Sequence, residues 1–310
     1  MDTRLAPSPT GEMHAGTIFA ALQAWLIARS TGGRVVLRIE DLDRDRSKAE
    51  YSDGIMRDLE ELGIDWDDGP FYQSDREGLY RDAFDELARA GAVYECFCSR
   101  ADLRSMSAPH EGEERVYDGR CHSLSDDDAA LRREELLGAG RRPAIRVEVP
   151  ARTVSFADLY QGERRYRLKD DCGDFVVRRA DGGFAYQLAV VVDDHDNGID
   201  CVSRGWDLLA STPKQMLLYD ALGFDIPAFA HFPLLCAPDG RRLSKRDHDA
   251  SYGSLKASLG SAEAVLGHVA YMGRLIDEDV PSRPEDVLAS FSVDRMRKRY
   301  EGTKSLAFSA

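Results

Sequence analysis

The sequence predicts an α/β fold, in which a doubly wound parallel sheet carries an inserted subdomain and is followed by a short helical region. The apolar stretches 3–6 and 34–39 flank a helical segment from Thr17, which is the pattern of a parallel strand–helix–strand unit. A polar, cysteine-containing stretch at 93–165 interrupts the alternation. We expect it to resume with a buried parallel strand at 186–193, because this stretch is apolar throughout its middle.

The remaining elements follow from local patterns. The spacing of apolar residues predicts helices at 51–62 and 77–90, and a further strand near 200–204. Thr212 and Pro213 suit the N-cap and first position of a helix that runs to about residue 222. Beyond the sheet, the sequence predicts an amphipathic helix at 262–272 and the start of another between 284 and 291.

Two short segments, far apart in the chain, point to ATP. The first is Arg4-Leu5-Ala6-Pro7-Ser8-Pro9-Thr10-Gly11, followed by His14-Ala15-Gly16-Thr17, and the second is Arg242-Leu243-Ser244-Lys245-Arg246. A helix that begins after the first segment offers free N–H groups to phosphate, Gly16 allows close approach, and His14 can donate a hydrogen bond. Lys245 supplies a point charge. Alone, each segment is also typical of an ordinary surface loop; together they predict a pocket that holds ATP from two sides.

The cysteines carry a separate signal. Cys96 and Cys98, with Cys121 downstream, have the spacing of a partial zinc site, in which three thiolates leave one tetrahedral position open. Tyr117 and His122 are both near enough in sequence to fill it, and on chemistry alone His122 is preferred. The alternative is a set of buried free thiols. The other three lie in or beside apolar stretches and are expected in the core: Cys172, Cys201 and Cys236.

Composition limits the partners. The net charge of −14, from 41 basic and 55 acidic residues, taken alone argues against a nucleic-acid partner, although phosphate contacts need only a local basic surface. Basic residues do cluster at 242–246 and 295–299. No apolar run approaches the roughly 20 residues that span a membrane, and the N-terminus lacks a signal-peptide pattern. We therefore expect a cytoplasmic protein with no membrane partner.

The two ATP segments resemble the signature motifs of class I aminoacyl-tRNA synthetases, and more narrowly those of the glutamyl branch. The resemblance continues through three further segments in the same order: Leu37–Asp43, Phe184–Asp194 and Arg204–Leu209. It implies a Rossmann-like catalytic domain that forms glutamyl-AMP from ATP and L-glutamate, with Mg²⁺ bridging the phosphates. The chain departs from the family pattern at Thr17, where many relatives carry histidine, and at Arg242 and Arg246, which replace lysine and serine.

The resemblance also assigns the site residues. Catalysis is implied for His14 and Lys245, and ATP binding for His14, Gly16, Thr17, Arg242, Ser244 and Lys245. Contacts to glutamate are implied for Arg4, Ala6, Pro7, Ser8, Glu40, Tyr186 and Arg204. The chemistry agrees, since guanidinium groups bind carboxylates and an acid receives the ammonium group. The alternatives are a helix-capping turn for Glu40 and core packing for Tyr186.

Within this branch, the chain is most similar to the glutamyl-Q subgroup, whose members are short paralogues of glutamyl-tRNA synthetase. In that subgroup a tyrosine precedes the last cysteine as Tyr-x-x-x-Cys, which favours Tyr117 as the fourth ligand of one structural zinc ion. The subgroup transfers glutamate to the queuosine base at the wobble position of tRNA(Asp). Only about 60 residues follow the second ATP segment, too few for a full anticodon-binding domain.

The expected organisation has four parts and a monomeric state. Residues 1–92 and 166–250 form the two halves of the nucleotide-binding catalytic domain. Residues 93–165 form an inserted zinc subdomain that faces the acceptor, and 251–310 form the short helical region. Two alternatives remain: a truncated synthetase that charges the 3′ end of tRNA, and a catalytically silent paralogue that binds tRNA.

Overall fold

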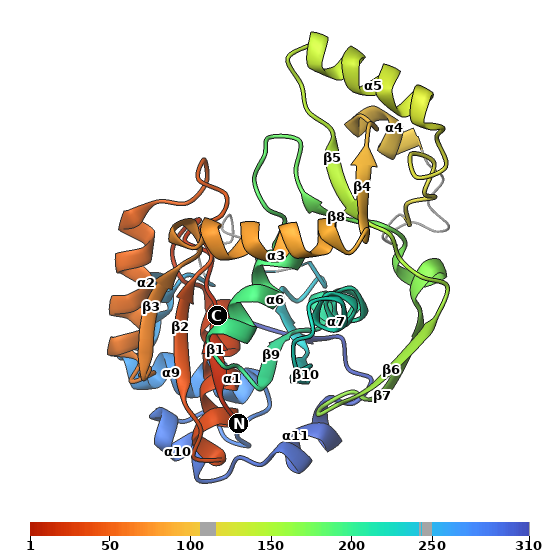
Figure 1. The fold of residues 1–310 in the computed structure, drawn as a ribbon. Helices are drawn as coiled ribbons and strands as arrows, with labels where there is room; N and C mark the ends of the chain where they lie inside the picture. Colours follow the sequence, from red (N-terminus) through yellow and green to blue (C-terminus); the bar gives the residue numbers. More distant parts are fainter. Residues whose placement is uncertain (106–115, 242, 244–249, 310) are drawn as a thin grey trace.

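The structure is a computed structural model that describes residues 1–105, 116–241, 243 and 250–309 (Figure 1). Two parallel sheets form its centre. One has the strand order β1-β2-β3, and the other has the order β7-β6-β10-β9, in which only the β6–β7 pair is antiparallel. Their strands are β1 (Thr3–Leu5), β2 (Val35–Ile39), β3 (Asp68–Tyr72), β6 (Thr153–Asp158), β7 (Gly162–Arg167), β9 (Cys201–Gly205) and β10 (Ala228–Phe232).

The two sheets meet at a seam between β1 and β9. The carbonyl oxygen of Asp2 accepts hydrogen bonds from the backbone N–H groups of Asp200 and Cys201, at 3.2 and 3.1 Å. The parallel strands therefore follow one another as β3-β2-β1-β9-β10, and chain order reverses direction at the seam. In open sheets of this kind, ligands bind beyond the carboxyl ends of the strands on either side of such a point.

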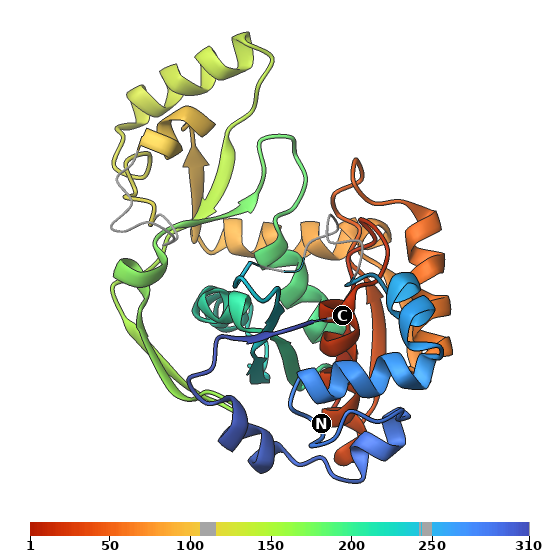
Figure 2. The ribbon, with the colours of Figure 1, turned by 180° about the vertical axis from the view of Figure 1, so that it is seen from behind.

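Helices cover both faces of this central layer. Along β2, the side chains of Val35, Leu37 and Ile39 enter one hydrophobic core while Val36 enters the other. The first core is shared with α1 (Ala15–Ser30), α2 (Ala49–Glu61) and the C-terminal helices, which lie against α1 when the molecule is seen from behind (Figure 2). The second core contains α3 (Glu77–Arg89), α6 (Tyr186–Asp196) and α7 (Thr212–Ala221). Burial on both faces confirms the doubly wound fold.

The predicted strand at 186–193 is wrong, because these residues form helix α6. The run from Leu188 to Asp194 is buried throughout. A helix that is buried on nearly all sides loses the polar stripe that would reveal its period of 3.6, so a short apolar run resembles a buried strand. The consequence is local: Asp194 lies in the last turn of a helix rather than beyond the end of a strand.

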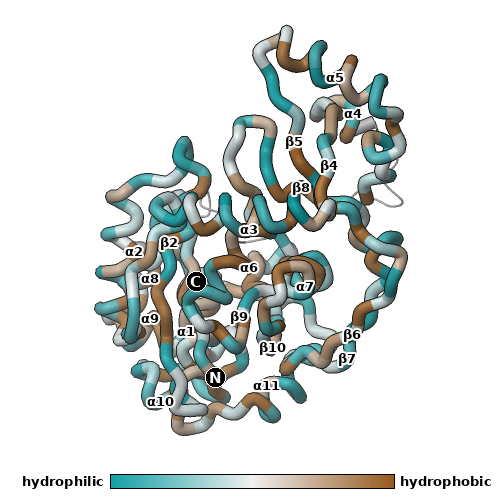
Figure 3. The backbone as a smooth tube through the Cα atoms, viewed as in Figure 1, coloured by the Kyte–Doolittle hydropathy of each residue, from teal (hydrophilic) through white to brown (hydrophobic). Residues whose placement is uncertain are grey.

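The interruption at 93–165 corresponds to a separate antiparallel sheet. Its strand order is β4-β5-β8, and it carries α4 (Arg100–Ser105) and α5 (Asp126–Gly138) at the far end of the molecule (Figure 1). Helix α5 buries no residue, and Figure 3 shows it as a mixture of hydrophobic and hydrophilic positions. The three strands are β4 (Val93–Cys96), β5 (Ala144–Val147) and β8 (Phe175–Arg178).

Strand pairing crosses the predicted limits of the insertion in both directions. Strand β8 lies after residue 165 yet pairs with β5, whereas β6 lies before it and pairs with β10 of the central layer. Near the C-terminus, β12 pairs in parallel with β11 in a separate two-stranded sheet. Among the described residues, no helix is both long and apolar enough to cross a membrane. The remaining α-helices and strands are β11 (Leu234–Cys236), α8 (Tyr252–Leu259), α9 (Ala262–Met272), α10 (Pro284–Leu288), α11 (Val293–Tyr300) and β12 (Ser305–Ala307).

Candidate active site

A cavity of about 170 Å³ opens at the seam between the two sheets. Its lining includes residues from the carboxyl ends of β1, β2 and β9, Tyr186 from the first turn of α6, and residues of α1 and α2. The structure thus brings together six of the seven residues assigned to glutamate: Arg4, Ala6, Pro7, Glu40, Tyr186 and Arg204. The seventh, Ser8, lies instead on a neighbouring cavity.

Arg4 is held in place by two contacts across the seam. Its Nε donates to Oδ1 of Asp194 at 3.1 Å, and its Nη1 donates to the carbonyl oxygen of Ser203 at 2.9 Å. Asp194 also accepts a 2.6 Å hydrogen bond from Nη1 of Arg38. Burial would raise the pKa of Asp194, but the charges of Arg38 and Arg4 outweigh it and lower this pKa. Asp194 is therefore an anion that fixes both arginines.

Glu40 offers a carboxylate at the cavity wall. Its backbone N–H donates to the carbonyl oxygen of Pro7 at 3.0 Å, and its Oε1 accepts a 3.2 Å hydrogen bond from Nη2 of Arg38. Burial raises the pKa of Glu40 in spite of the opposing charges of Arg38 and Arg4. An ammonium group in the cavity would stabilise the ionised form of this carboxyl.

Arg204 differs from Arg4 because its hydrogen-bond partners are neutral. Only 4% of it is exposed, and its three nitrogens donate to Nε2 of His231 (3.0 Å), Oε1 of Gln215 (2.6 Å) and Oγ1 of Thr212 (2.9 Å). No described carboxylate lies within salt-bridge distance of it. Burial lowers the pKa of Arg204. A buried cation without an anion is costly, so this wall of the cavity suits a ligand that brings a carboxylate.

Sequence reasoning missed the residues that hold Arg204. Thr212 was expected to cap α7, but Ser211 occupies the cap position and the Thr212 hydroxyl serves Arg204 instead. His231 carried a signal, since it is the one polar residue in the otherwise apolar strand β10. No signal in the sequence marked its partner Asp158. The two residues lie about 70 positions apart and meet only because β6 pairs with β10.

A second cavity, of about 460 Å³, adjoins the first and is lined by the start of α1. Helix α1 begins at Ala15, two residues earlier than predicted, and His14 is its N-cap. Nδ1 of His14 accepts a 3.1 Å hydrogen bond from the backbone N–H of Gly16, so the neutral ring carries its proton on Nε2 and can donate it. A Cβ atom at Gly16 would lie 3.1 Å from this ring, so a larger residue would require the ring to shift by a few tenths of an ångström. Thr17 lines both cavities.

The second ATP segment falls largely outside the described residues, including Arg242, Ser244, Lys245 and Arg246. One described residue of the segment lies at the second cavity, and residues that follow the segment contact the start of α1. Leu243 lines this cavity, and Ser251 forms an isolated β-bridge with His14. The backbone N–H of Tyr252 also donates to the carbonyl oxygen of Met13 at 2.8 Å. These contacts attach the chain that follows Lys245 to the start of α1.

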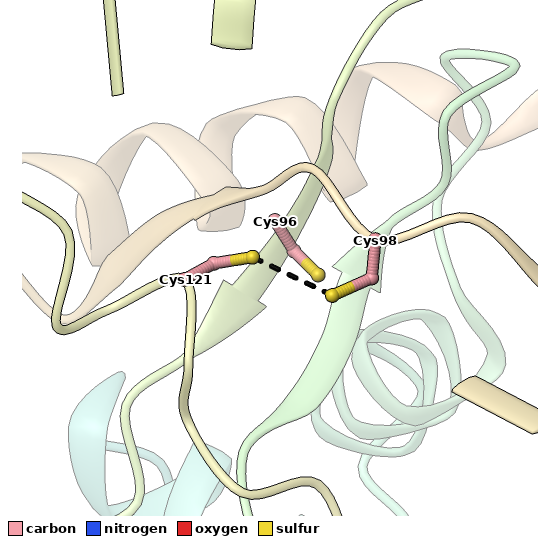
Figure 4. A group of neighbouring side chains, drawn as sticks. All are labelled: Cys96, Cys98 and Cys121. Carbon is pink, nitrogen blue, oxygen red and sulfur yellow. Dashed lines mark hydrogen bonds between the residues drawn. The ribbon is translucent and has the colours of Figure 1, made fainter. Parts of the chain in front are cut away.

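The three clustered thiols converge at the end of β4 (Figure 4). The sulfur atoms of Cys96, Cys98 and Cys121 all lie within 4.8 Å of one another. The hydroxyl oxygen of Tyr117 is 3.6 Å from Sγ of Cys96 and 3.5 Å from Sγ of Cys98. By contrast, Nε2 of His122 lies 3.4 Å from a Glu148 carboxylate oxygen. The donor set that fits a tetrahedral metal ion therefore consists of three sulfurs and the tyrosine oxygen.

The other three cysteines are buried and take no part in this cluster. Cys201 lies in β9, Cys236 in β11 and Cys172 just before β8. Each is less than 9% exposed, which agrees with the expected place in the core.

Comparison with known proteins agrees with this geometry. Residues 1–282 match the family model described as tRNA synthetases class I (E and Q), catalytic domain. The chain is 45% identical to a glutamyl-Q tRNA(Asp) synthetase of Symbiobacterium thermophilum, covering 94% of this chain and 93% of that protein. It is 43% identical to a glutamate–tRNA ligase of a Synechococcus species, covering 87% of this chain but only 56% of the ligase.

A solved structure gives the same result at the level of the fold. The crystal structure of a glutamate tRNA ligase from Elizabethkingia meningosepticum, in complex with its amino acid, matches with a TM-score of 0.80 at 27% identity. The match covers all of this chain and 67% of the ligase chain. The chain therefore belongs to the class I tRNA synthetases of the E and Q group.

Proposed function

We propose that this protein activates L-glutamate with ATP and transfers the glutamyl group to the queuosine base at the wobble position of tRNA(Asp). The observation that carries the proposal is the 45% identity to a glutamyl-Q tRNA(Asp) synthetase along 93% of that relative. The cavity at the seam supports it, because its walls present two guanidinium groups and one carboxylate to a ligand.

Free glutamate has the matching charges, namely two carboxylates and one ammonium group. Arg204, which has only neutral partners, receives one carboxylate, and Arg4 contributes to binding the other. Glu40 receives the ammonium group, and Tyr186 closes the wall with Ala6, Pro7 and the neighbouring Ser8. Glutamine has only one carboxylate, so it would leave one of the two guanidinium groups of the cavity without an anion, and this arrangement favours the acid over the amide.

Activation takes place between the two cavities. An oxygen of the glutamate α-carboxylate attacks the α-phosphorus of ATP, the bond to the oxygen that bridges the α- and β-phosphates breaks, and pyrophosphate leaves. A Mg²⁺ ion bound with ATP would neutralise charge on its phosphates. Nε2–H of His14 and the ammonium group of Lys245 stabilise the charge on the phosphate oxygens. Gly16 and Thr17 at the start of α1, with Arg242 and Ser244 of the second segment, complete the ATP site.

Transfer needs only a hydroxyl nucleophile from the RNA. A ring hydroxyl of the queuosine cyclopentene attacks the carbonyl carbon of glutamyl-AMP, an ester forms, and AMP leaves. Specific RNA recognition usually targets loops whose bases can turn outward, and the wobble position lies in such a loop. Because one chain supplies every proposed glutamate contact, we further propose that the protein acts as a monomer. We also propose that it acts in the cytoplasm.

The thiol cluster is proposed to hold one structural zinc ion, with ligands Cys96, Cys98, Tyr117 and Cys121. The ion would supply no chemistry to the reaction. Its ligands come from the end of β4 and from a segment some 20 residues further along, so it would tie the two together. The antiparallel sheet offers this subdomain little hydrophobic core of its own, since α5 buries no residue.

The test is transfer of labelled glutamate to two tRNA pools, one from cells that make queuosine and one from cells that cannot. The proposal expects label on the first pool only. It also expects that label to persist when the 3′-terminal adenosine of the tRNA is removed beforehand. Equal labelling of both pools, lost with the terminal adenosine, would show charging at the 3′ end instead. Absence of ATP binding would indicate a silent paralogue.

A further inference from the structure

We propose that His231 and Asp158 are positioning residues for glutamate, and that they act through Arg204. Together the three side chains form a buried chain that ends at the cavity wall. The inference rests on the proposed function, because it concerns how Arg204 presents its guanidinium group to the substrate. Neither His231 nor Asp158 lines the cavity, so any effect on substrate must pass through Arg204.

The hydrogen-bond chemistry allows only one arrangement of the ring. Nε of Arg204 is always a donor, so Nε2 of His231, which is 3.0 Å away, must accept. The ring proton is then on Nδ1, which donates to Oδ2 of Asp158 at 2.5 Å. Asp158 therefore selects the tautomer of His231 that can hold Arg204.

Asp158 is itself fixed by backbone groups of the β6–β7 turn and of β10. Its Oδ1 accepts hydrogen bonds from the backbone N–H groups of Tyr160 (3.0 Å), Gln161 (2.9 Å) and His231 (3.1 Å). Three backbone donors leave this carboxylate little freedom to rotate, and Oδ2 remains directed at the ring. Both Asp158 and His231 are almost completely buried, at 2% and 0% exposed, so water does not compete for these contacts.

A neutral ring can orient the guanidinium group of Arg204 without forming an ion pair with it, which a carboxylate in the same place could not do. If an acid contacted Arg204 directly, it would form an ion pair and compete with the carboxylate of the substrate. The ring instead orients Nε while keeping the negative charge of Asp158 one side chain away. The guanidinium group is thus held in one direction without losing its affinity for an anion.

The decisive variant is Asp158→Asn, which keeps a carbonyl oxygen for the three backbone donors but presents an NH₂ group to Nδ1. The ring must then accept at Nδ1 and carry its proton on Nε2, facing the Nε–H of Arg204. We expect the KM for glutamate to rise roughly 10- to 100-fold, because a hydrogen bond to a buried charged group is replaced by opposed donors. The KM for ATP should stay within about twofold of the wild-type value.

The assay is glutamate-dependent exchange of pyrophosphate into ATP, with queuosine-containing tRNA present. The matched control is Asp174→Asn, the same change at another buried carboxylate (1% exposed), which lies beside the antiparallel sheet and away from the cavity. It should leave the KM for glutamate unchanged. A second pair of variants separates positioning from folding: His231→Gln retains an acceptor for Arg204 and should bind glutamate better than His231→Leu.

The proposal is overturned if Asp158→Asn folds and leaves the KM for glutamate unchanged, or if Gln and Leu at position 231 behave alike. If the wild-type protein shows no glutamate-dependent exchange, the proposed function fails first. The buried chain is then judged by the ¹⁵N chemical shifts of the His231 ring at pH 7. These should show the proton on Nδ1 in the wild type and on Nε2 in Asp158→Asn, and identical shifts in both proteins would refute it.

Discussion

Replacing Asp194 by asparagine should destabilise the protein far more than the same change two residues later in the same helix. Asp194 is 2% exposed, and its Oδ1 accepts from both Arg4 and Arg38. Asparagine has nearly the same shape, so the variant removes the charge rather than the packing. What remains is a pair of buried guanidinium groups that have lost a shared anion.

The magnitude follows from the contacts that survive. Removing one partner of a buried ion pair costs about 3–5 kcal/mol. Arg38 keeps its 3.2 Å contact with Glu40, and Arg4 keeps its contact with the Ser203 carbonyl oxygen, so the expected loss of stability is about 3 kcal/mol. The control is Asp196→Asn. Asp196 pairs with Arg76 at 2.5 Å but is 46% exposed, so its loss should cost less than about 1 kcal/mol.

The stability of both variants can be measured by urea unfolding, followed by tryptophan fluorescence. With an m-value of about 3 kcal/mol/M for a chain of this size, the midpoint should fall by about 1 M for Asp194→Asn and by less than about 0.3 M for Asp196→Asn. Equal shifts for the two variants, or a shift below about 0.3 M for Asp194→Asn, would refute the view that Asp194 anchors the arginines of the cavity.

Three further predictions concern catalysis, metal and pH. Lys245→Ala should lower the rate of adenylate formation at least about 100-fold while changing glutamate binding little, as judged by single-turnover kinetics; an unchanged rate would contradict its assignment. Purified protein should contain close to one equivalent of zinc by metal analysis. Tyr117→Phe should weaken zinc retention against a chelator by roughly tenfold, whereas His122→Ala should not, and the reverse order would assign the ligand to His122. Burial, helped by the charge of Arg204 and opposed by Asp158, lowers the pKa of His231 to about 4 from 6.5. The folded state therefore binds fewer protons than the unfolded state, and stability should fall as the pH drops from about 6.5 toward 4, by up to ~3 kcal/mol; the loss should be smaller in His231→Gln.

Features of the structure that depend on residues close together in the sequence could be predicted, whereas features that depend on contacts between distant residues could not. Strands β1, β2 and β9, and most helices, followed from patterns within 20 residues, and so did the positions of Glu40 and Arg204 at strand ends. Helix α6 did not, because a buried helix and a buried strand are both apolar on every side. The limits of the insertion could not be predicted from local patterns either, because they depend on which distant strands pair with β6 and β8.

The same distinction applies within the site. The side chains predicted to bind glutamate belong to recognisable motifs, whereas the contacts that support them from behind cannot be recognised in the sequence. His231 and Asp158 meet through a pairing of strands, and Asp194 meets Arg4 across 190 positions of the chain. Contacts of this kind leave no periodic trace in a single sequence, so reasoning from motifs finds the wall of the cavity but not what supports it.

The seam between β1 and β9 sets the order in which the protein can mature on the ribosome. Strand β1 is made first, but its neighbour β9 is made about 200 residues later, and β10 later still. At synthesis rates of about 5–20 residues per second, the nascent β1 lacks this neighbour for roughly 10–40 s. During that time the N-terminal strands can pair only among themselves. The binding cavity is thus among the last features to be completed, and a nascent chain that stops short of β9 lacks both the site and the part of the first core that the C-terminal helices supply.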